Sequence, residues 1–255
     1  MFKPSHVHHS HCKESCQAFV PESFGLLNWN VYKKNRSNAE FSSFLQSHFE
    51  TLPEFMLLQE AQFDPDRGCM LESFSFEAAA NLEMEHGYYG VLTASRVVTQ
   101  DAKAFLSEEK EMFFGTHKSL LLSTYLFEDG RELLLVNIHA INFRENNAYE
   151  REKQRLYRFL ASYQGAVVLA GDFNTWSSSR LKILLEVTES LGLHRVPYAS
   201  EEGIKSFFGN HLDMIFYRGL ELLDHAVLDD GGISDHRPLY ASFALSAQDD
   251  DLMSS

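Results

Sequence analysis

The segment Ala166–Thr175 joins a short apolar run to two polar residues, and no other pattern in the chain constrains its fold so strongly. The aliphatic residues Ala166–Ala170, followed by Gly171, are typical of a strand that is buried on both faces. Asp172 and Asn174 then stand two residues apart at the end of that strand. A carboxylate and an amide are therefore expected where a buried sheet meets solvent.

The combination of an apolar run with a polar residue recurs along the chain. It is found in the segments Leu26–Asn30, Phe55–Glu60, Leu133–His139, Leu212–Tyr217 and Ser234–Phe243. If these segments converge, one site contains Asn30, Glu60, His139, Asp172, Asn174, Asp213, Asp235 and His236. Such a site is rich in carboxylate and amide oxygens, which are the ligands that Mg²⁺ prefers. The sequence therefore predicts a metal-dependent phosphoester hydrolase.

Composition sets the size of the fold and limits the class of partner. With 255 residues, 44% of them hydrophobic, the chain can bury the core of one domain, which we expect over residues 24–245. The formal net charge of −14 argues against tight, sequence-independent DNA binding, because such binding depends on Lys and Arg displacing counterions from phosphates. A nuclease is compatible with this charge, since a bound metal ion supplies positive charge locally.

Cysteine content and hydropathy bear on the cellular compartment. The chain has 3 Cys, which do not make a disulfide framework, and its start does not resemble a secretory signal peptide. No apolar stretch approaches the roughly 20 residues that a membrane span needs. We therefore expect a cytoplasmic protein without a transmembrane segment; the oligomeric state is not predicted.

Both ends of the chain differ in composition from the central part. Residues 1–23 gather imidazoles and thiols between His6 and Cys16, and we interpret them as a disordered arm. The alternative is an arm that binds a soft metal such as zinc or copper, but no second cluster completes a four-ligand site. Residues 246–255 are interpreted as a solvated acidic tail.

Strand-like and helix-like patterns alternate between these ends. Helical spacing is seen after residue 37, over 147–163 and over 178–190, where Leu181, Leu184 and Leu185 are expected to be buried. The strands flanking Asp129-Gly130 are predicted to form a hairpin, whereas residues 63–84 give no clear assignment. Strands interrupted by a few helices favour two sheets packed face to face with helices outside.

The ordered motifs resemble those of the endonuclease/exonuclease/phosphatase superfamily. They are Asn-Trp-Asn at 28–30, Leu-Gln-Glu at 58–60, Asn-Ile-His at 137–139, Gly-Asp-Phe-Asn at 171–174, Leu-Asp-Met-Ile-Phe at 212–216 and Ser-Asp-His at 234–236. The match is most similar to a poorly characterised bacterial subgroup. The resemblance implies a four-layered α/β sandwich, in which two mainly antiparallel sheets are flanked by helices, and Mg²⁺- or Mn²⁺-dependent hydrolysis.

The resemblance also implies a role for each residue of the predicted site. Glu60 matches the metal ligand, Asn30 belongs to the shell around the metal, and Asp235 matches a second acid on the metal side. Asp172 matches the residue that orients or deprotonates the attacking water, with Asn174 as its partner. His236 and His139 match histidines that contact the phosphate, and Asp213 matches the carboxylate that orients His236.

The substrate is the least constrained part of the prediction. A phosphodiester of nucleic acid or a nucleotide is favoured, and Trp176 and Arg180 are candidates for contacting it because they directly follow the Asn174 turn. Lys205 is a further candidate for the border of the cleft. The alternatives are a phosphatase or phospholipase that acts on phosphoinositide or sphingomyelin-type head groups, and a catalytically silent binding protein on the same fold.

Overall fold

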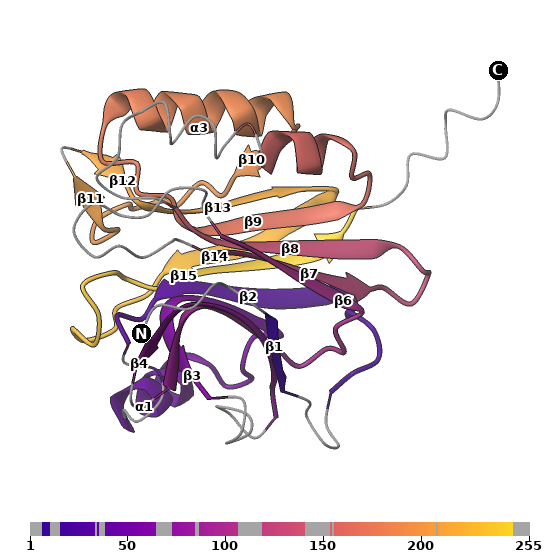
Figure 1. The fold of residues 1–255 in the computed structure, drawn as a ribbon, viewed down its shortest axis with the longest axis horizontal. Coiled ribbons are helices and arrows are strands. Elements are labelled where there is room, and N and C mark those ends of the chain that lie inside the picture. The colour runs from indigo at the N-terminus through magenta and orange to yellow at the C-terminus, as the bar shows by residue number, and fades with distance from the viewer. Residues whose placement is uncertain are drawn as a thin grey trace.

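Two β-sheets lie face to face in this computed structural model, with helix α3 outside one sheet and helix α1 outside the other (Figure 1). The structure describes residues 7–10, 16–33, 35, 39–64, 73–84, 87–106, 119–140, 154, 156–207 and 209–246. Helix α1 spans Ala39–His48 and helix α3 spans Ser178–Ser190. The predicted four-layered α/β sandwich is confirmed.

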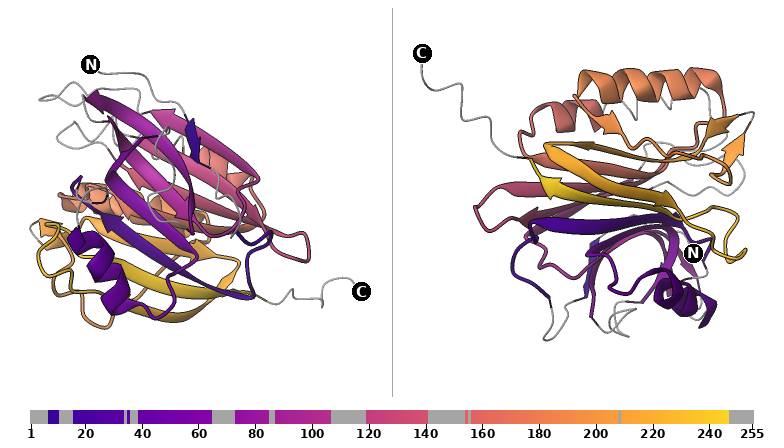
Figure 2. Two further views of the ribbon diagram at one scale, coloured as in Figure 1. Left: turned by 90° about the horizontal axis from the view of Figure 1, so that it is seen from below. Right: turned by 180° about the vertical axis from the view of Figure 1, so that it is seen from behind.

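The first sheet has seven strands, in which β2 and β3 form the parallel pair. In spatial order they are β1 (Val7–Ser10), β4 (Ser75–Met84), β5 (Gly87–Ser95), β3 (Phe55–Phe63), β2 (Ser23–Asn30), β15 (Leu239–Leu245) and β14 (Leu220–Val227). Helix α1 connects β2 to β3 and packs on the outer face of this sheet, as the views from below and behind also show (Figure 2).

The second sheet has six strands, in which β8 and β9 form the parallel pair. In spatial order they are β10 (His194–Arg195), β13 (Asp213–Arg218), β9 (Ala166–Asp172), β8 (Glu132–His139), β7 (Ser119–Leu126) and β6 (Asp101–Leu106). Two short strands, β11 (Ser206–Phe207) and β12 (Asn210–His211), make a separate hairpin. The predicted hairpin of β7 and β8 is confirmed by their antiparallel pairing.

Side chains that point alternately to the two faces of the central strands fill the spaces between the layers. Leu26 and Leu57 belong to the core between the two sheets, whereas the next residue of each strand packs into the core around helix α1. Leu184 of α3 is buried in a third core against the outer face of the six-stranded sheet. Because successive side chains of a strand point to opposite faces, a central strand that is apolar at every position joins two cores.

The two parallel pairs place the ends of four strands at one edge of the sandwich. Asn30 pairs with Gln59 in register, and His139 pairs with Asp172. Strand β13 runs antiparallel to β9, so that its first residue, Asp213, lies beside Asp172. The apolar runs of these strands therefore meet solvent at the same edge in both sheets, as the sequence predicted.

Gly171 allows β8 and β9 to approach one another directly before this edge. Its φ is +150°, and a Cβ atom there would overlap the carbonyl oxygen of Ile138. We expect Gly171→Ala to lower the free energy of unfolding by about 1–3 kcal/mol, measured by urea denaturation. Gly130→Ala is the matched control, since Gly130 has φ +84° but a Cβ atom there would meet nothing within 4 Å. Equal losses in the two variants would contradict this role of Gly171.

Several parts of the fold differ from the sequence prediction. The folded part begins before residue 24, because β1 pairs with β4 and Val20 is buried between the sheets. Strands β4 and β6 were not assigned from the sequence. Leu185 is exposed and Leu181 only partly buried, whereas Arg180 is buried on α3.

Some predictions concern residues outside the described part of the chain. Residues 147–153 and 155 of the predicted helix lie there, whereas residues 156–161 are helical as predicted. Nearly all of the acidic tail also lies there, as do the side chains on which the soft-metal hypothesis depends, apart from that of Cys16. None of the described helices is both long and apolar enough to cross a membrane.

Candidate active site

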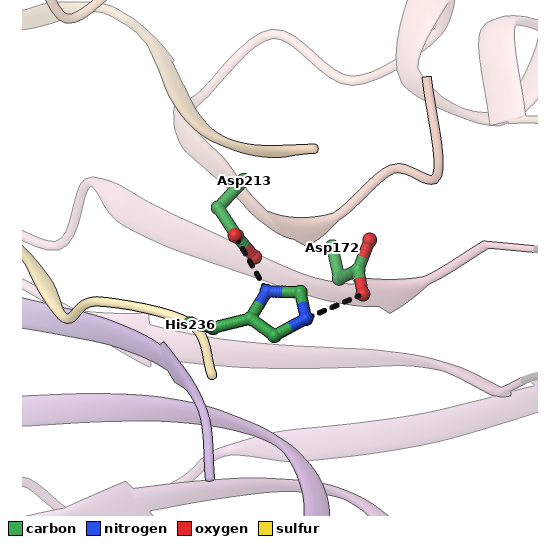
Figure 3. Close-up of side chains that lie close together, drawn as sticks. All are labelled: Asp172, Asp213 and His236. Carbon is green, nitrogen blue, oxygen red and sulfur yellow. Dashed lines mark hydrogen bonds and ion pairs between the residues drawn. The ribbon is translucent and has the colours of Figure 1, made fainter. Parts of the chain in front are cut away.

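The imidazole of His236 lies between two buried carboxylates at the solvent edge of the sandwich (Figure 3). Its Nδ1 is 2.7 Å from Oδ2 of Asp213, and its Nε2 is 3.9 Å from Oδ2 of Asp172. Asp213 is the first residue of β13 and Asp172 is the last residue of β9, whereas His236 comes from the loop before β15. The short contact at Nδ1 is a hydrogen bond that fixes the ring, and it turns Nε2 toward Asp172.

Asp172 is the residue on which the other side chains converge. Its Oδ2 accepts a hydrogen bond from Nδ2 of Asn30 at 3.2 Å and lies 3.6 Å from Nε2 of His139. Its Oδ1 accepts a hydrogen bond from the backbone N–H of Asn174 at 3.0 Å. Asn30 belongs to one sheet and His139 to the other, so Asp172 joins the two halves of the predicted site.

Glu60 reaches the same edge through an irregularity in β3. The pairing of β3 with β5 shifts register between Leu58 and Ala61, and Glu60 has a left-handed φ of +49°. Its Oε1 lies 4.0 Å from Nε2 of His139, and its side chain is 26% exposed. Bulges of this kind redirect side chains near functional sites. The irregularity places a partly hydrated carboxylate beside the buried group around Asp172.

A bridge of buried amides between the two sheets lies next to these residues. Nε2 of Gln59 donates to Oδ1 of Asn28 at 2.9 Å and to Oδ1 of Asn137 at 2.8 Å. Nδ2 of Asn137 in turn donates to the carbonyl of Leu58 at 3.2 Å. These amides had no role in the site predicted from the sequence. A sequence signal was present, because each amide lies one or two positions before a predicted site residue inside an apolar strand.

The environment of His236 determines its charge. Burial alone would lower the pKa of His236, but the charge of Asp213, its hydrogen bond, and the charges of Asp172 and Asp235 outweigh burial and raise the pKa to about 9. The imidazole is therefore protonated at neutral pH. A protonated imidazole is a hydrogen-bond donor at both nitrogens, which suits it to contact a phosphate oxygen.

The loop that carries His236 is bound to the end of β2. Nε1 of Trp29 donates to the carbonyl of His236 at 2.8 Å, and Oγ of Ser234 donates to the carbonyl of Asn30 at 2.6 Å. The backbone N–H of Ser234 is held by Asp230 at 2.7 Å. These bonds fix the position of His236 relative to Asn30.

Asp235 lies at the exposed rim of the site, next to two cationic side chains. Its Oδ2 is 2.5 Å from Nζ of Lys205, its Oδ1 is 3.9 Å from Nε2 of His236, and its side chain is 55% exposed. Burial would raise the pKa of Asp235, but the hydrogen bond from Lys205 and the charge of His236 hold it below its usual value. Among the contacts of the described residues, Asp235 is paired with these two cations and not with Glu60 or Asn30.

Arg180 does not border the site, contrary to the sequence hypothesis. Its side chain is fully buried, its Nη1 donates to the carbonyl of Asn174 at 3.2 Å, and its guanidinium lies 4.7 Å from the centre of the Trp176 ring. Asn174 has a left-handed φ of +50°, and its Nδ2 donates to the carbonyl of Ala140 at 2.9 Å. Arg180 therefore supports the turn that brings the N–H of Asn174 to Asp172.

The donor set of the site fits a divalent cation. Carboxylate oxygens of Asp172 and Asp213 lie within 4.8 Å of each other and of a His236 nitrogen, but the protonated imidazole has no lone pair for a metal, so the donors are the oxygen atoms. Oδ1 of Asp213 is buried without a hydrogen-bond partner in the described part of the chain. A buried carboxylate oxygen of this kind requires a cation or a water donor. Glu60 and Asn30 add further oxygen donors nearby.

Comparison with known proteins identifies the family. The sequence profile described as "Endonuclease/Exonuclease/phosphatase family" matches residues 27–236, which include every residue of the predicted site. The chain belongs to the endonuclease/exonuclease/phosphatase family. Membership in this family supports phosphoester hydrolysis as the class of activity.

Similar proteins and structures agree with this assignment. A UPF0294 protein of Yersinia enterocolitica is 34% identical over 87% of this chain and 84% of its own length. A crystal structure of a family protein from Bacteroides thetaiotaomicron has a TM-score of 0.64 at 16% identity, over 90% of this chain and 100% of that one. D. rerio TDP2, complexed with a single-strand DNA product, has a TM-score of 0.60 at 16% identity, over 88% of this chain and 99% of its own. At these identities the two structures support the fold of the family.

Proposed function

We propose that the protein is a divalent-metal-dependent phosphodiesterase that acts like a nuclease, by attack of water on phosphorus. The observation that carries this proposal is the alignment of Asp213, His236 and Asp172, with Asn30 and His139 bonded or close to the same oxygen of Asp172. A catalytically silent binding protein would not need this complete set of acids, amides and imidazoles. The DNA product bound by D. rerio TDP2 supports a nucleic-acid phosphodiester as substrate.

Glu60 and Asn30 would hold Mg²⁺ or Mn²⁺ through their oxygen atoms. When bound, this ion neutralises negative charge on the phosphoryl oxygens in the transition state. Glu60 remains partly hydrated, whereas Asp172 is buried. This difference would suit Glu60 to hold the ion and Asp172 to face the reacting water.

Asp172 orients the attacking water and accepts its proton. Its Oδ1 is fixed by the N–H of Asn174, which leaves Oδ2 to face the reactants. Protonated His236 donates a hydrogen bond from Nε2 to a non-bridging phosphate oxygen, and His139 contacts the phosphate from the β8 side. As the water oxygen bonds to phosphorus, the bond from phosphorus to the leaving oxygen breaks. Negative charge develops on the phosphoryl oxygens in the transition state. Hydrogen-bond donors that are already in position stabilise this charge without having to reorganise.

Removal of divalent metal tests the proposal. After treatment with EDTA we expect the protein to lose turnover of bis-p-nitrophenyl phosphate and to regain it with Mg²⁺ or Mn²⁺. Glu60→Gln should raise the metal concentration that gives half-maximal rate by about 10- to 100-fold, as is typical when a group supporting a metal is changed. The exposed Glu221, at the start of β14, provides the control variant Glu221→Gln, which should leave this concentration unchanged. Turnover that persists in EDTA would contradict the proposed function.

A further inference from the structure

Left-handed backbone is concentrated beside the candidate active site. Among the described residues other than glycine, φ is positive at Tyr32, Lys33, Glu60 and Asn174. Glu60 and Asn174 belong to the predicted site, whereas Tyr32 and Lys33 directly follow Asn30. A left-handed conformation costs an L-residue about 1–2 kcal/mol, and such strain persists where surrounding contacts impose it, often at functional sites. The Tyr32-Lys33 turn therefore needs an explanation.

Backbone hydrogen bonds hold this turn on residues of the site. The N–H of Tyr32 donates to Oδ1 of Asn30 at 3.2 Å, and the N–H of Lys33 donates to the carbonyl of Glu60 at 3.0 Å. The turn is thus bound to both residues proposed to lie at the metal. A group attached to the scissile phosphate would pass close to this turn.

The turn presents an aromatic ring and an ammonium group to solvent. Tyr32 is 54% exposed, which is unusual for so large an apolar surface. Nζ of Lys33 lies 6.0 Å from the centre of the Tyr32 ring and 5.9 Å from that of Tyr89, at the start of β5. Tyr89 pairs with Gln62 at the end of β3. Two phenol rings therefore flank a single cation at the rim.

We propose that Tyr32, Lys33 and Tyr89 bind one nucleotide of a single-stranded nucleic acid next to the scissile phosphodiester. In this arrangement Tyr32 stacks on the base and Lys33 contacts the adjoining phosphate. The inference rests on the proposed phosphodiesterase function and adds its substrate class. Stacking contributes affinity for any base. Stacking also suits a chain of net charge −14, in which acidic residues outnumber the basic residues that could contact phosphates.

The position of Lys33 disfavours one of the other substrates considered from the sequence, a sphingomyelin-type head group that carries choline. Aromatic cages bind the quaternary ammonium of choline through the faces of their rings. Here the protein's own ammonium lies close to both rings, so a choline head group would meet a like charge. The same charge attracts the phosphates of a nucleic acid.

A double-mutant cycle between protein and substrate tests this inference. The substrates are single-stranded oligonucleotides that carry an abasic residue at each position flanking the cleaved bond in turn. In the wild type, we expect loss of one base to lower kcat/KM by about tenfold, within the range known for base stacking. In Tyr32→Ala, kcat/KM for the intact oligonucleotide should already be lower by about the same factor, and loss of the same base should have no further effect. Tyr32→Phe, which keeps the ring, should behave as the wild type.

Two controls separate stacking from disturbance of the strained turn. Tyr32→Asn removes the ring but suits a left-handed backbone, so it should reproduce the result of Tyr32→Ala. Phe19→Ala removes a comparably exposed ring, 45% accessible, near the β7–β8 turn at the opposite edge, and should show the wild-type dependence on the base. An equal effect of base removal in the wild type, in Tyr32→Ala and in Tyr32→Asn would overturn the inference. Failure of the wild type to cleave any phosphodiester would instead overturn the proposed function.

Discussion

Asp172→Asn is expected to lower kcat/KM for phosphodiester hydrolysis by at least about 10²- to 10³-fold, the loss typical of removing one group from a preorganised site. Asparagine has nearly the same shape and can still accept the hydrogen bond from the N–H of Asn174. It cannot take a proton from water, and it presents no charge to His139 and His236, which face Asp172 at 3.6 and 3.9 Å. Steady-state kinetics at saturating Mg²⁺ measures the effect.

A matched control for this variant is available on the opposite side of the sheet. Asp101 is an exposed carboxylate at the start of β6, paired with Lys103 at 2.8 Å. Asp101→Asn should keep the rate of the wild type. Far-UV circular dichroism and thermal unfolding of both variants establish that each is folded. A folded Asp172→Asn protein with wild-type turnover would remove Asp172 from the mechanism.

Asp213→Asn is expected to shift the pH dependence of the reaction. The wild-type pKa of His236 is about 9, because Asp213 and the other acids outweigh burial. Without the charge of Asp213, burial becomes the larger influence, and the pKa should fall toward or below the ordinary value of about 6.5. The rate at pH 8 should then drop more than about tenfold, with a smaller loss at pH 6, because His236 must be protonated to act.

The same pair links folding stability to pH. A raised pKa means that the folded state binds the proton more tightly than the unfolded state. Its stabilisation is therefore complete below the unfolded value near 6.5 and is lost as pH rises through about 9. NMR titration of the His236 ring and urea denaturation between pH 6 and pH 10 measure both effects. A ring pKa that is unchanged in Asp213→Asn would contradict the pairing of these residues.

The convergence of the site was predictable because it depends on local patterns. Each predicted residue adjoins an apolar run, and parallel pairing of β2 with β3 and of β8 with β9 brings such ends to one edge. The order of the motifs, together with the family resemblance, was enough to select Asp172, Asp213 and His236. Their mutual distances still required the fold, since they come from three segments separated along the chain.

Other features depend on tertiary contacts that a single sequence does not reveal. Lys205 precedes Asp235 by 30 residues, and nothing in their local sequence indicates that the two form an ion pair. Arg180 stands early in a helix, where exposure is the ordinary expectation, yet it is buried beneath the Asn174 turn. Strand β4 was missed because its alanine-rich sequence lacks the β-branched residues typical of strands.

The most direct test of the proposed function is hydrolysis across a substrate panel by the wild type and by Asp172→Asn. The panel comprises single- and double-stranded DNA, abasic DNA, RNA, phosphoinositides and sphingomyelin, each with Mg²⁺, with Mn²⁺ and with EDTA. We predict metal-dependent turnover of a single-stranded nucleic acid that Asp172→Asn abolishes. A folded, metal-loaded wild type that turns over none of these substrates would contradict the proposed function.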